Sequence, residues 1–415
     1  MVTARDPQRI AKGVGRVKRK ISVDELQYGM YVWELDRPWT DAPFMFQGWV
    51  LQTPEQLETL RTYCRYVYVD SERSVAVARP ESEAGVVPLP GIGQVEYVER
   101  ATVEAELPQA ENAFAETQLA MQESFEAVGA GEALDSGQIK TAVAKTTESI
   151  IRNPDALVLF SKLKERSSYL VGRATNVSIY MISFARFLGL GPDEIEKAGM
   201  VGLLQDVGNL RLSSELLEKR ARLTPEEYDL VKKHVTHAVE ILGATPGLPS
   251  WLPALAALHH ERYDGSGYPN GLSGAGIGTI GGIAGIADTF DALTSKRPYA
   301  APVPPSIALG MLHKMRGKAF HPELVEQFIR CIGIFPVGSV VELNSGEVGI
   351  VIAQNVEKRL QPRVMVVRTP DGQPLRPQKL LDLSKAPKAT PDEAYRIRRT
   401  LEYGQAGVGV RDLFF

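Results

Sequence analysis

The chain has 415 residues, a formal net charge of −3 and 44% hydrophobic residues. This size allows two or three domains, and the balanced charge gives no bias toward specific nucleic-acid or membrane binding. No apolar run is long enough to span a membrane. Only Cys64 and Cys331 are present, and the first residues form no apolar signal region, so a reducing cytoplasm is the expected compartment.

The N-terminal part is expected to contain a tail, a small domain and a linker. Residues 1–20 are rich in Lys and Arg, which favours a flexible, solvated tail over a segment that touches nucleic acid or anionic lipid. In residues 21–77, aromatic and β-branched strand signals flank one helical segment and predict a small α/β domain. Residues 78–94 are rich in Pro, Gly and Glu, as expected of a linker.

The remainder is expected to be mainly helical and to end in a small β module. Residues 95–152 have the spacing of amphipathic helices that lead into a bundle and are candidates to mediate a homodimer. Residues 153–335 predict an all-helical bundle. Residues 336–385 alternate short apolar strands with Asn-Ser-Gly and Pro-Asp-Gly turns, which predicts a small β-barrel or meander, and residues 386–415 are assigned to a C-terminal tail. The predicted fold class is therefore multi-domain and mainly α.

Two neighbouring segments of the helical part carry residues suited to phosphoester chemistry. The segment HHERYDGSGYPNGL places His259 and His260 before a tight Gly-Ser-Gly-Tyr-Pro turn, a pattern that predicts a metal site joined to a loop. In the segment IADTFDALTSKRPY, Asp288 and Asp291 lie one helical turn apart, and Lys296 and Arg297 follow as cations for phosphate oxygens. Metal ligands followed by phosphate binders suggest phosphoester hydrolysis.

Several of these residues also have purely structural interpretations. His234 lies on a helix that begins with a capping box at Thr224 and Glu227, and alone it would be read as a buried core histidine. Asp206 precedes a glycine at a helix end, where aspartate often makes local backbone hydrogen bonds. The two histidines downstream make metal ligation the better interpretation for His234, whereas Asp291 is read as structural.

Together these motifs resemble the HD-GYP family of bacterial metal-dependent phosphodiesterases, which act on cyclic di-GMP, and the resemblance runs from about Asn153 to Phe335. It implies a helical HD-type bundle with a small α/β domain ahead of it, similar to the uncharacterised domain common in one subgroup. It also implies that Asp206 would be catalytic and that iron, manganese, nickel or zinc would be the metal. The ligands implied by the resemblance are Asp206, His234, His259, His260 and Asp288.

The sequence departs from the family pattern at three chemically important positions. Arg173 stands where the first family histidine is expected, Gln205 replaces the histidine of the His-Asp pair, and Asn209 replaces a lysine. No histidine precedes His234, so no shift of the alignment restores the early ligands. The resemblance therefore implies one crippled and one mostly intact metal position, with fewer ions than a full site or none. Arg173 is expected to pair with Asp206 or Asp288 and to face a ligand phosphate.

Glycines are also more frequent than expected near this site. Gly281, Gly282 and Gly285 precede Asp288, and each interior glycine costs a helix about 0.5 to 1 kcal/mol relative to alanine, so a looser ligand helix is expected. In the loop, Gly267 would let the backbone approach a ligand, and a tyrosine can stack on guanine or bind a phosphate oxygen. The predicted substrate-binding residues are Arg173, Gly267, Tyr268, Pro269, Lys296 and Arg297.

Three functions are compatible with the sequence. The first is a cyclic di-GMP signalling protein with an eroded site that retains ligand or partner binding and has weak or no hydrolysis. The second is a working phosphodiesterase for cyclic di-GMP or its linear product pGpG. The third is a scaffold that contacts diguanylate cyclases through the Gly-Tyr-Pro loop. The first is preferred because the three departures remove a metal position and a cation, whereas loss of one electrostatic stabiliser already costs about a hundredfold or more in rate.

Overall fold

The computed structural model describes residues 18–36, 49–51, 54–70, 89–163, 168–295, 302–355 and 358–401. The chain divides into two compact units, residues 1–86 and residues 87–415. Among the described residues, no helix has both the length and the apolar character needed to cross a lipid bilayer.

The described part of the first unit is a small antiparallel sheet with one α-helix. The strands are β1 (Lys18–Ser22), β2 (Tyr31–Leu35), β3 (Trp49–Val50) and β4 (Tyr66–Asp70), in the order β1-β4-β2-β3. Helix α1 (Pro54–Tyr63) precedes β4. Alternate residues of β4, such as Val67 and Val69, point into a shared apolar core with Leu60 of α1, as the period of a strand requires.

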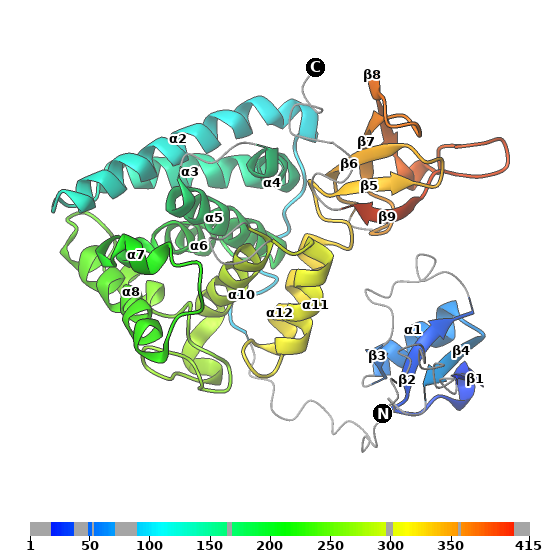
Figure 1. The fold of residues 1–415 in the computed structure, drawn as a ribbon, viewed down its shortest axis with the longest axis horizontal. Coiled ribbons are helices and arrows are strands. Elements are labelled where there is room, and N and C mark those ends of the chain that lie inside the picture. The colour runs from blue at the N-terminus through cyan, green and yellow to red at the C-terminus, as the bar shows by residue number, and fades with distance from the viewer. Residues whose placement is uncertain are drawn as a thin grey trace, which may run out of the picture. The chain divides into compact units, whose positions relative to one another are not determined.

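The second unit is built around one buried helix, α5 (Tyr169–Phe187) (Figure 1). Ser168 caps its start by accepting from the amide of Val171. Every residue from Val171 to Ala185 is buried, so polar side chains on this helix must find partners inside the protein. The helices that precede it are α2 (Val103–Gly129), α3 (Ser136–Arg152) and α4 (Pro154–Leu163).

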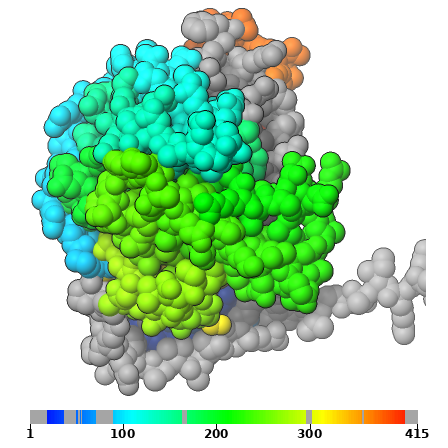
Figure 2. Space-filling model, turned by 90° about the vertical axis from the view of Figure 1, so that its left-hand side faces the viewer, coloured from blue at the N-terminus to red at the C-terminus, as the bar shows by residue number. Residues whose placement is uncertain are grey.

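The segments after α5 complete the helical body and carry the ligand candidates. They are α6 (Pro192–Leu204), η3 (Val207–Arg211), α7 (Ser214–Leu217), α8 (Pro225–Ala244), α9 (Leu252–Ala256), η4 (Gly274–Ile277), α10 (Gly278–Thr294), α11 (Pro305–Met315) and α12 (Pro322–Ile332). In the space-filling view, cyan residues of α2 and α3 border the green residues of α7 and α8 (Figure 2).

A five-stranded antiparallel sheet follows the helices. Its strands are β5 (Val340–Leu343), β6 (Val348–Ala353), β7 (Arg363–Arg368), β8 (Pro374–Asp382) and β9 (Ile397–Leu401). The order β8-β7-β6-β5-β9 contains the predicted meander, and Gly346 and Gly372 have positive φ in the two predicted turns. The assignment of a tail from residue 386 needs correction, because β9 lies inside it and pairs with β5.

The β module is tied to the helical body by polar contacts. Arg363 of β7 forms an ion pair with Glu104 of α2, with 2.6 Å between Nη2 and Oε1. The amide of Gln354, just after β6, donates to Asp155 Oδ2 of α4 at 2.8 Å. Burial raises the pKa of Asp155 to about 7, although the Gln354 amide acts in the opposite direction.

This aspartate predicts a stability change with pH. An acid with a higher pKa in the folded protein binds more protons there than in the unfolded chain, so stability falls as the pH rises from about 4 to about 7. We expect Asp155→Asn to remove that part of the decline, because an amide oxygen still accepts from Gln354 and carries no charge. Thermal unfolding at pH 5 and pH 8 tests this, and an equal decline in both proteins would contradict it.

Candidate functional site

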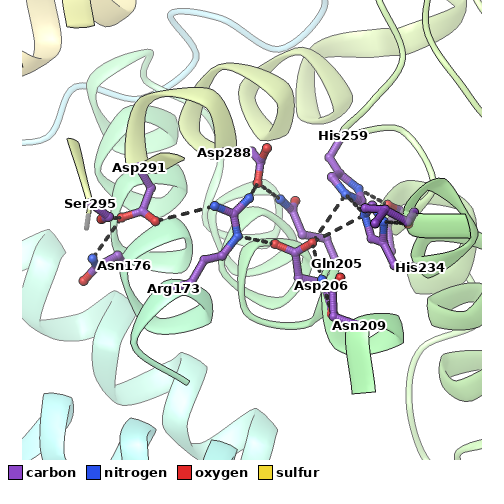
Figure 3. Close-up of polar contacts among 12 residues, drawn as sticks. Arg173, Asn176, Gln205, Asp206, Asn209, His234, His259, Asp288, Asp291 and Ser295 are labelled. Atoms are coloured by element: carbon purple, nitrogen blue, oxygen red, sulfur yellow. Dashed lines mark hydrogen bonds and ion pairs between the residues drawn. The ribbon is translucent and has the colours of Figure 1, made fainter. Parts of the chain in front are cut away.

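The candidate site lies where three helices and two turns converge, in the helical body (Figure 3). Arg173 comes from α5, Asp206 from the turn after α6, His234 from α8, His259 from the turn after α9, and Asp288 from α10. All five are buried. The structure therefore brings together side chains from segments more than 100 residues apart, as in the 115-residue separation of Arg173 and Asp288.

A glycine allows α8 to approach the turn that carries Asp206. A Cβ atom on Gly208 would lie 1.9 Å from the His234 carbonyl oxygen, so a larger residue would push α8 away. The start of α8 has the predicted capping box between Thr224 and Glu227, with Pro225 in the first turn. These local features fix where His234 stands on the helix and how closely it approaches Asp206.

The ring orientation of two histidines is set by backbone carbonyls. Nδ1 of His234 lies 2.7 Å from the Val231 oxygen, and Nδ1 of His259 lies 2.7 Å from the Ala256 oxygen. A carbonyl oxygen only accepts hydrogen bonds, so both Nδ1 atoms carry the proton. Each neutral ring then presents the lone pair of Nε2, which is how metal-binding histidines are usually held.

These lone pairs converge with a carboxylate oxygen. The two Nε2 atoms lie 3.2 Å apart, and Asp206 Oδ1 lies 3.5 Å from that of His234 and 3.8 Å from that of His259. Two nitrogens each about 2.1 Å from one ion, at about 90 to 109°, would stand about 3.0 to 3.4 Å apart. His260 completes a group in which one ligand atom from each histidine lies within 4.8 Å of the others. The donor set fits one transition-metal ion.

Arg173 occupies the opposite side of Asp206 from the histidines (Figure 3). Its Nε donates to Asp206 Oδ2 at 2.7 Å, and its Nη2 donates to Asp288 Oδ1. The expected pairing of Arg173 is thus present with both carboxylates. Asp288 lies beside Arg173, where Gln205 Nε2 also reaches its Oδ1 at 3.4 Å.

Asp291 extends this network away from the histidines. Its Oδ1 accepts from Asn176 Nδ2 and Ser295 Oγ, each at 2.9 Å, and its Oδ2 lies 3.9 Å from Arg173 Nη1. Asp291 thus binds neighbouring side chains, as a structural residue would, and it also lies beside Arg173. The carboxylates of Asp206, Asp288 and Asp291 carry three formal negative charges, and the guanidinium of Arg173 carries one positive charge. One divalent ion would balance the two negative charges that remain.

Burial and neighbouring charges favour the ionised form of Asp206 and the neutral forms of His259 and His260. Burial alone would raise the pKa of Asp206, but Arg173, His259 and His234 together hold it below its usual range. Burial lowers the pKa of His259, and burial followed by its two histidine neighbours lowers the pKa of His260 well below the usual value. Ionised carboxylate and neutral imidazole are the protonation states that bind metal.

The Gly-Tyr-Pro loop is fastened to the site by a residue that the sequence interpretation did not include. Glu261 is buried, and its two carboxylate oxygens accept from the amides of Asn270 at 2.7 Å and Leu272 at 2.9 Å. Gly267 is required because a Cβ there would lie 2.4 Å from the Arg262 nitrogen. Tyr268 turns inward and stacks on His260, with ring centroids 4.6 Å apart, whereas Pro269 is exposed.

A cavity of about 1310 Å³ opens over this arrangement. It is larger than the roughly 300 to 1,000 Å³ of pockets for drug-sized ligands, so it has room for a dinucleotide. Besides the site residues, Arg220 and Arg262 contribute positive charge to its lining, and Tyr169 and Tyr228 contribute aromatic rings. Lys296 and Arg297, predicted for the same purpose, lie outside the described residues.

The glycines of α10 have a packing role. A Cβ on Gly281 would lie 2.8 Å from Leu258 Cβ, and one on Gly282 would lie 2.6 Å from Leu324 Cδ1. A Cβ on Gly285 would lie 3.1 Å from the His259 oxygen. These glycines therefore allow α10 to approach the histidine turn and α12 closely. Close packing is thus a physical reason for their presence that differs from the looser helix expected from the sequence.

The cluster predicts a specific loss of metal on substitution. We expect His234→Ala to lower bound divalent metal from about one equivalent per chain to less than about a tenth, because a ligand with a fixed ring is removed. His237→Ala, on the same helix but outside the cluster, should leave the metal in place. Elemental analysis after dialysis measures both, and equal metal content in the two variants would contradict this assignment.

Comparison with known proteins gives three family matches along the chain. Residues 158–324 match an HD domain, residues 18–139 match a domain of unknown function, DUF3391, and residues 340–393 match a KOW domain associated with HD domains. The HD match lies within the segment whose motifs resemble HD-GYP proteins. The KOW match includes the five-stranded sheet up to the segment before β9.

Curated relatives carry consistent names. "Cyclic di-GMP phosphodiesterase PA4108" of Pseudomonas aeruginosa is 29% identical over 89% of this chain and 89% of its own length. "Cyclic di-GMP phosphodiesterase" of Thermotoga maritima is 36% identical over 40% of this chain and 43% of its own. "3'3'-cGAMP-specific phosphodiesterase 2" of Vibrio cholerae is 34% identical over 44% of this chain and 34% of its own. The chain thus carries an HD domain between a DUF3391 domain and a KOW domain associated with HD domains, and it is similar to proteins named cyclic di-GMP phosphodiesterases.

Proposed function

We propose that this protein is a cyclic di-GMP signalling protein whose HD-GYP site holds a reduced metal centre, retains ligand binding and has weak or no hydrolytic activity. The names of the relatives support the ligand class. The observation that carries the loss of activity is the guanidinium of Arg173, which is buried between Asp206 and Asp288. A fixed positive charge there repels a second divalent ion from the same carboxylates.

The remaining ligands define what the site would do. His234, His259, His260 and Asp206 Oδ1 would hold one ion, which supplies Lewis-acid stabilisation of a phosphate oxygen. Asp288 is engaged with Arg173 and balances its charge. Arg173 stays charged at any accessible pH and lines the cavity, so it would also attract the negatively charged ligand.

Tyr268 supports a role for the loop in ligand binding. Its ring faces the cavity and stacks on His260, and burial raises the pKa of its phenol far above the usual value. The phenol therefore stays protonated and can donate a hydrogen bond to a phosphate oxygen. This inward orientation favours ligand contact over use of the tyrosine as an outer docking surface for diguanylate cyclases.

Binding and turnover separate the proposed function from its alternatives. Purified protein is incubated anaerobically with iron or manganese and either cyclic di-GMP or 3'3'-cGAMP, and linear products are followed by chromatography. Calorimetry measures binding of the same nucleotides, with His259→Ala as the control for the metal site. We expect saturable binding of cyclic di-GMP and little or no product even when enzyme and substrate concentrations are similar.

The other outcomes have distinct meanings. Multiple turnovers that disappear in His259→Ala would show that one reduced ligand shell suffices, and the protein would be a working phosphodiesterase for cyclic di-GMP or pGpG. Absence of both binding and turnover would leave the scaffold interpretation, in which the exposed part of the loop contacts partner proteins. Homodimer formation through the lead-in helices stays a separate prediction.

A further inference from the structure

A second cavity lies between the helical body and the β module. Its volume is about 110 Å³, and it is lined by residues of α4, α5 and α12 and by residues that follow β6. Asp155 and Gln354, which join these two parts of the unit by a hydrogen bond, are among them. Contacts between α4 and β6 place the two elements side by side (Figure 1).

Helix α5 contributes three residues to the lining of this cavity whose buried polar atoms lack hydrogen-bond partners among the described residues. They are Tyr180, Ser183 and Arg186 of α5, spaced three residues apart, and all three line the cavity. Tyr180 Oη, Ser183 Oγ, and both Nε and Nη2 of Arg186 are buried and have no hydrogen-bond partner among the described residues. Tyr180 and Ser183 are buried as whole residues, with 2% and 7% exposure.

A buried hydrogen-bond donor that has no partner lowers the stability of the folded protein. The destabilisation is larger when the unsatisfied donor is charged, as it is in Arg186. Every one of the four atoms can donate a hydrogen bond, and the two guanidinium nitrogens form a fixed fork. A ligand that accepts several hydrogen bonds from neighbouring donors is the chemical complement of this set.

The charge of the cavity agrees with a negatively charged ligand. Four basic side chains line it, Lys162, Arg186, Arg330 and Arg359, against the acidic Glu99 and Asp155. Burial, followed by the positive charge of Arg330, lowers the pKa of Arg359. Like charges are therefore held close together here, and an anion would relieve their repulsion.

We propose that this cavity binds one phosphate group, which connects α5 of the HD domain to the β module. Arginine forks bind phosphate oxygens in a bidentate manner, and hydroxyl groups such as those of Tyr180 and Ser183 can donate to the remaining oxygens. A cavity of about 110 Å³ accepts a phosphate group, whereas a whole nucleotide needs the larger volumes typical of ligand pockets, roughly 300 Å³ or more.

The phosphate has two chemical sources, free inorganic phosphate and the terminal phosphate of a nucleotide. Arg330 is exposed at the cavity, so a nucleoside attached to the phosphate would extend past it into solvent. The two sources share the contacts to Arg186 and Ser183 and differ only outside the cavity. Inorganic phosphate and GMP are therefore both used as probes.

The test is calorimetric titration of the 415-residue protein carrying His259→Ala, which impairs the metal site and so weakens phosphate binding in the main cavity, whose remaining cations are unaffected by changes at Arg186. We expect saturable binding of inorganic phosphate, reduced at least about tenfold by adding Arg186→Gln. Arg211→Gln serves as the matched control, because Arg211 is an exposed partner of Glu240 and should not alter binding. Tighter binding of GMP than of phosphate indicates a nucleotide phosphate, and equal or tighter binding of inorganic phosphate indicates the free anion.

A second variant keeps the proposal testable if Arg186→Gln does not fold. Ser183→Ala removes only a hydroxyl group and is expected to weaken phosphate binding severalfold, with a matching loss of the phosphate-dependent rise in unfolding temperature. No saturable binding of either probe at millimolar concentrations, or binding that both variants leave unchanged, would overturn the proposal. Ordered water would then be the simpler partner of these atoms.

Discussion

Replacing Arg173 by methionine is expected to lower the free energy of unfolding by about 3 to 5 kcal/mol, because removal of one member of a buried ionic network leaves its partners uncompensated. Asp206 and Asp288 would lose the guanidinium that donates to both of them. Asp291 would lose its nearest positive charge, 3.9 Å away. Methionine has a similar length, so the loss reports mainly on charge and hydrogen bonding.

Urea unfolding measures this change, with Arg211→Met as the control. Arg211 also forms an ion pair, with Glu240, but both side chains are about half exposed, so its loss should cost no more than about 1 kcal/mol. Excess manganese should recover part of the stability of Arg173→Met, because a divalent ion can take the place of the guanidinium. Similar losses in the two variants would contradict a special role for Arg173.

Joint replacement of Arg173 and Gln205 by histidine is the second large expected effect. The double variant removes the positive charge that opposes an ion at Asp206 and Asp288 and supplies two imidazoles in its place. We expect bound metal to rise above that of the unmodified protein, and hydrolysis of cyclic di-GMP to rise by about a hundredfold or more, the scale of one well-placed electrostatic stabiliser.

Two further variants isolate the cause. Arg173→His alone should gain less metal than the double variant, since Gln205 remains in place of a second imidazole and its Nε2 still donates to Asp288. The double variant with His259→Ala should lose the gained activity, because the three-histidine cluster is then incomplete. Unchanged metal content in the double variant would count against the view that Arg173 replaces an ion. Metal gain without faster hydrolysis would point instead to the missing cation at Asn209.

The sequence was most informative where structure depends on local patterns. The capping box at Thr224, the turns around Gly346 and Gly372, and the helical segment before Asn153 follow from neighbouring residues. The β9 strand was missed because its partner, β5, lies far away in sequence. Its own segment has no turn-flanked alternation that separates it from a tail.

The residue types gathered at the candidate site were named from the sequence, whereas their arrangement depends on the fold; their roles as ligands stay predictions. Ligand types and the pairing of Arg173 could be inferred from a motif in which an arginine replaces a histidine. The inward turn of Tyr268 and the division of Asp206 between Arg173 and the histidines depend on distances across the fold. Glu261 follows His259 and His260 directly, so its place in the motif was visible, but its bonds to loop amides nine and eleven residues ahead were not.

Those two hydrogen bonds connect the Gly-Tyr-Pro loop to the turn that carries the histidines. Glu261 directly follows His259 and His260 in the chain, and its carboxylate accepts hydrogen bonds from the backbone amides of Asn270 and Leu272 in the loop. The histidine turn, the carboxylate and the loop backbone are therefore connected to one another by a covalent and a hydrogen-bonded link. If a bound ion drew the imidazoles together, these bonds would transmit the displacement to the loop, and the exposed surface at Pro269 would then differ between the metal-free and metal-bound protein.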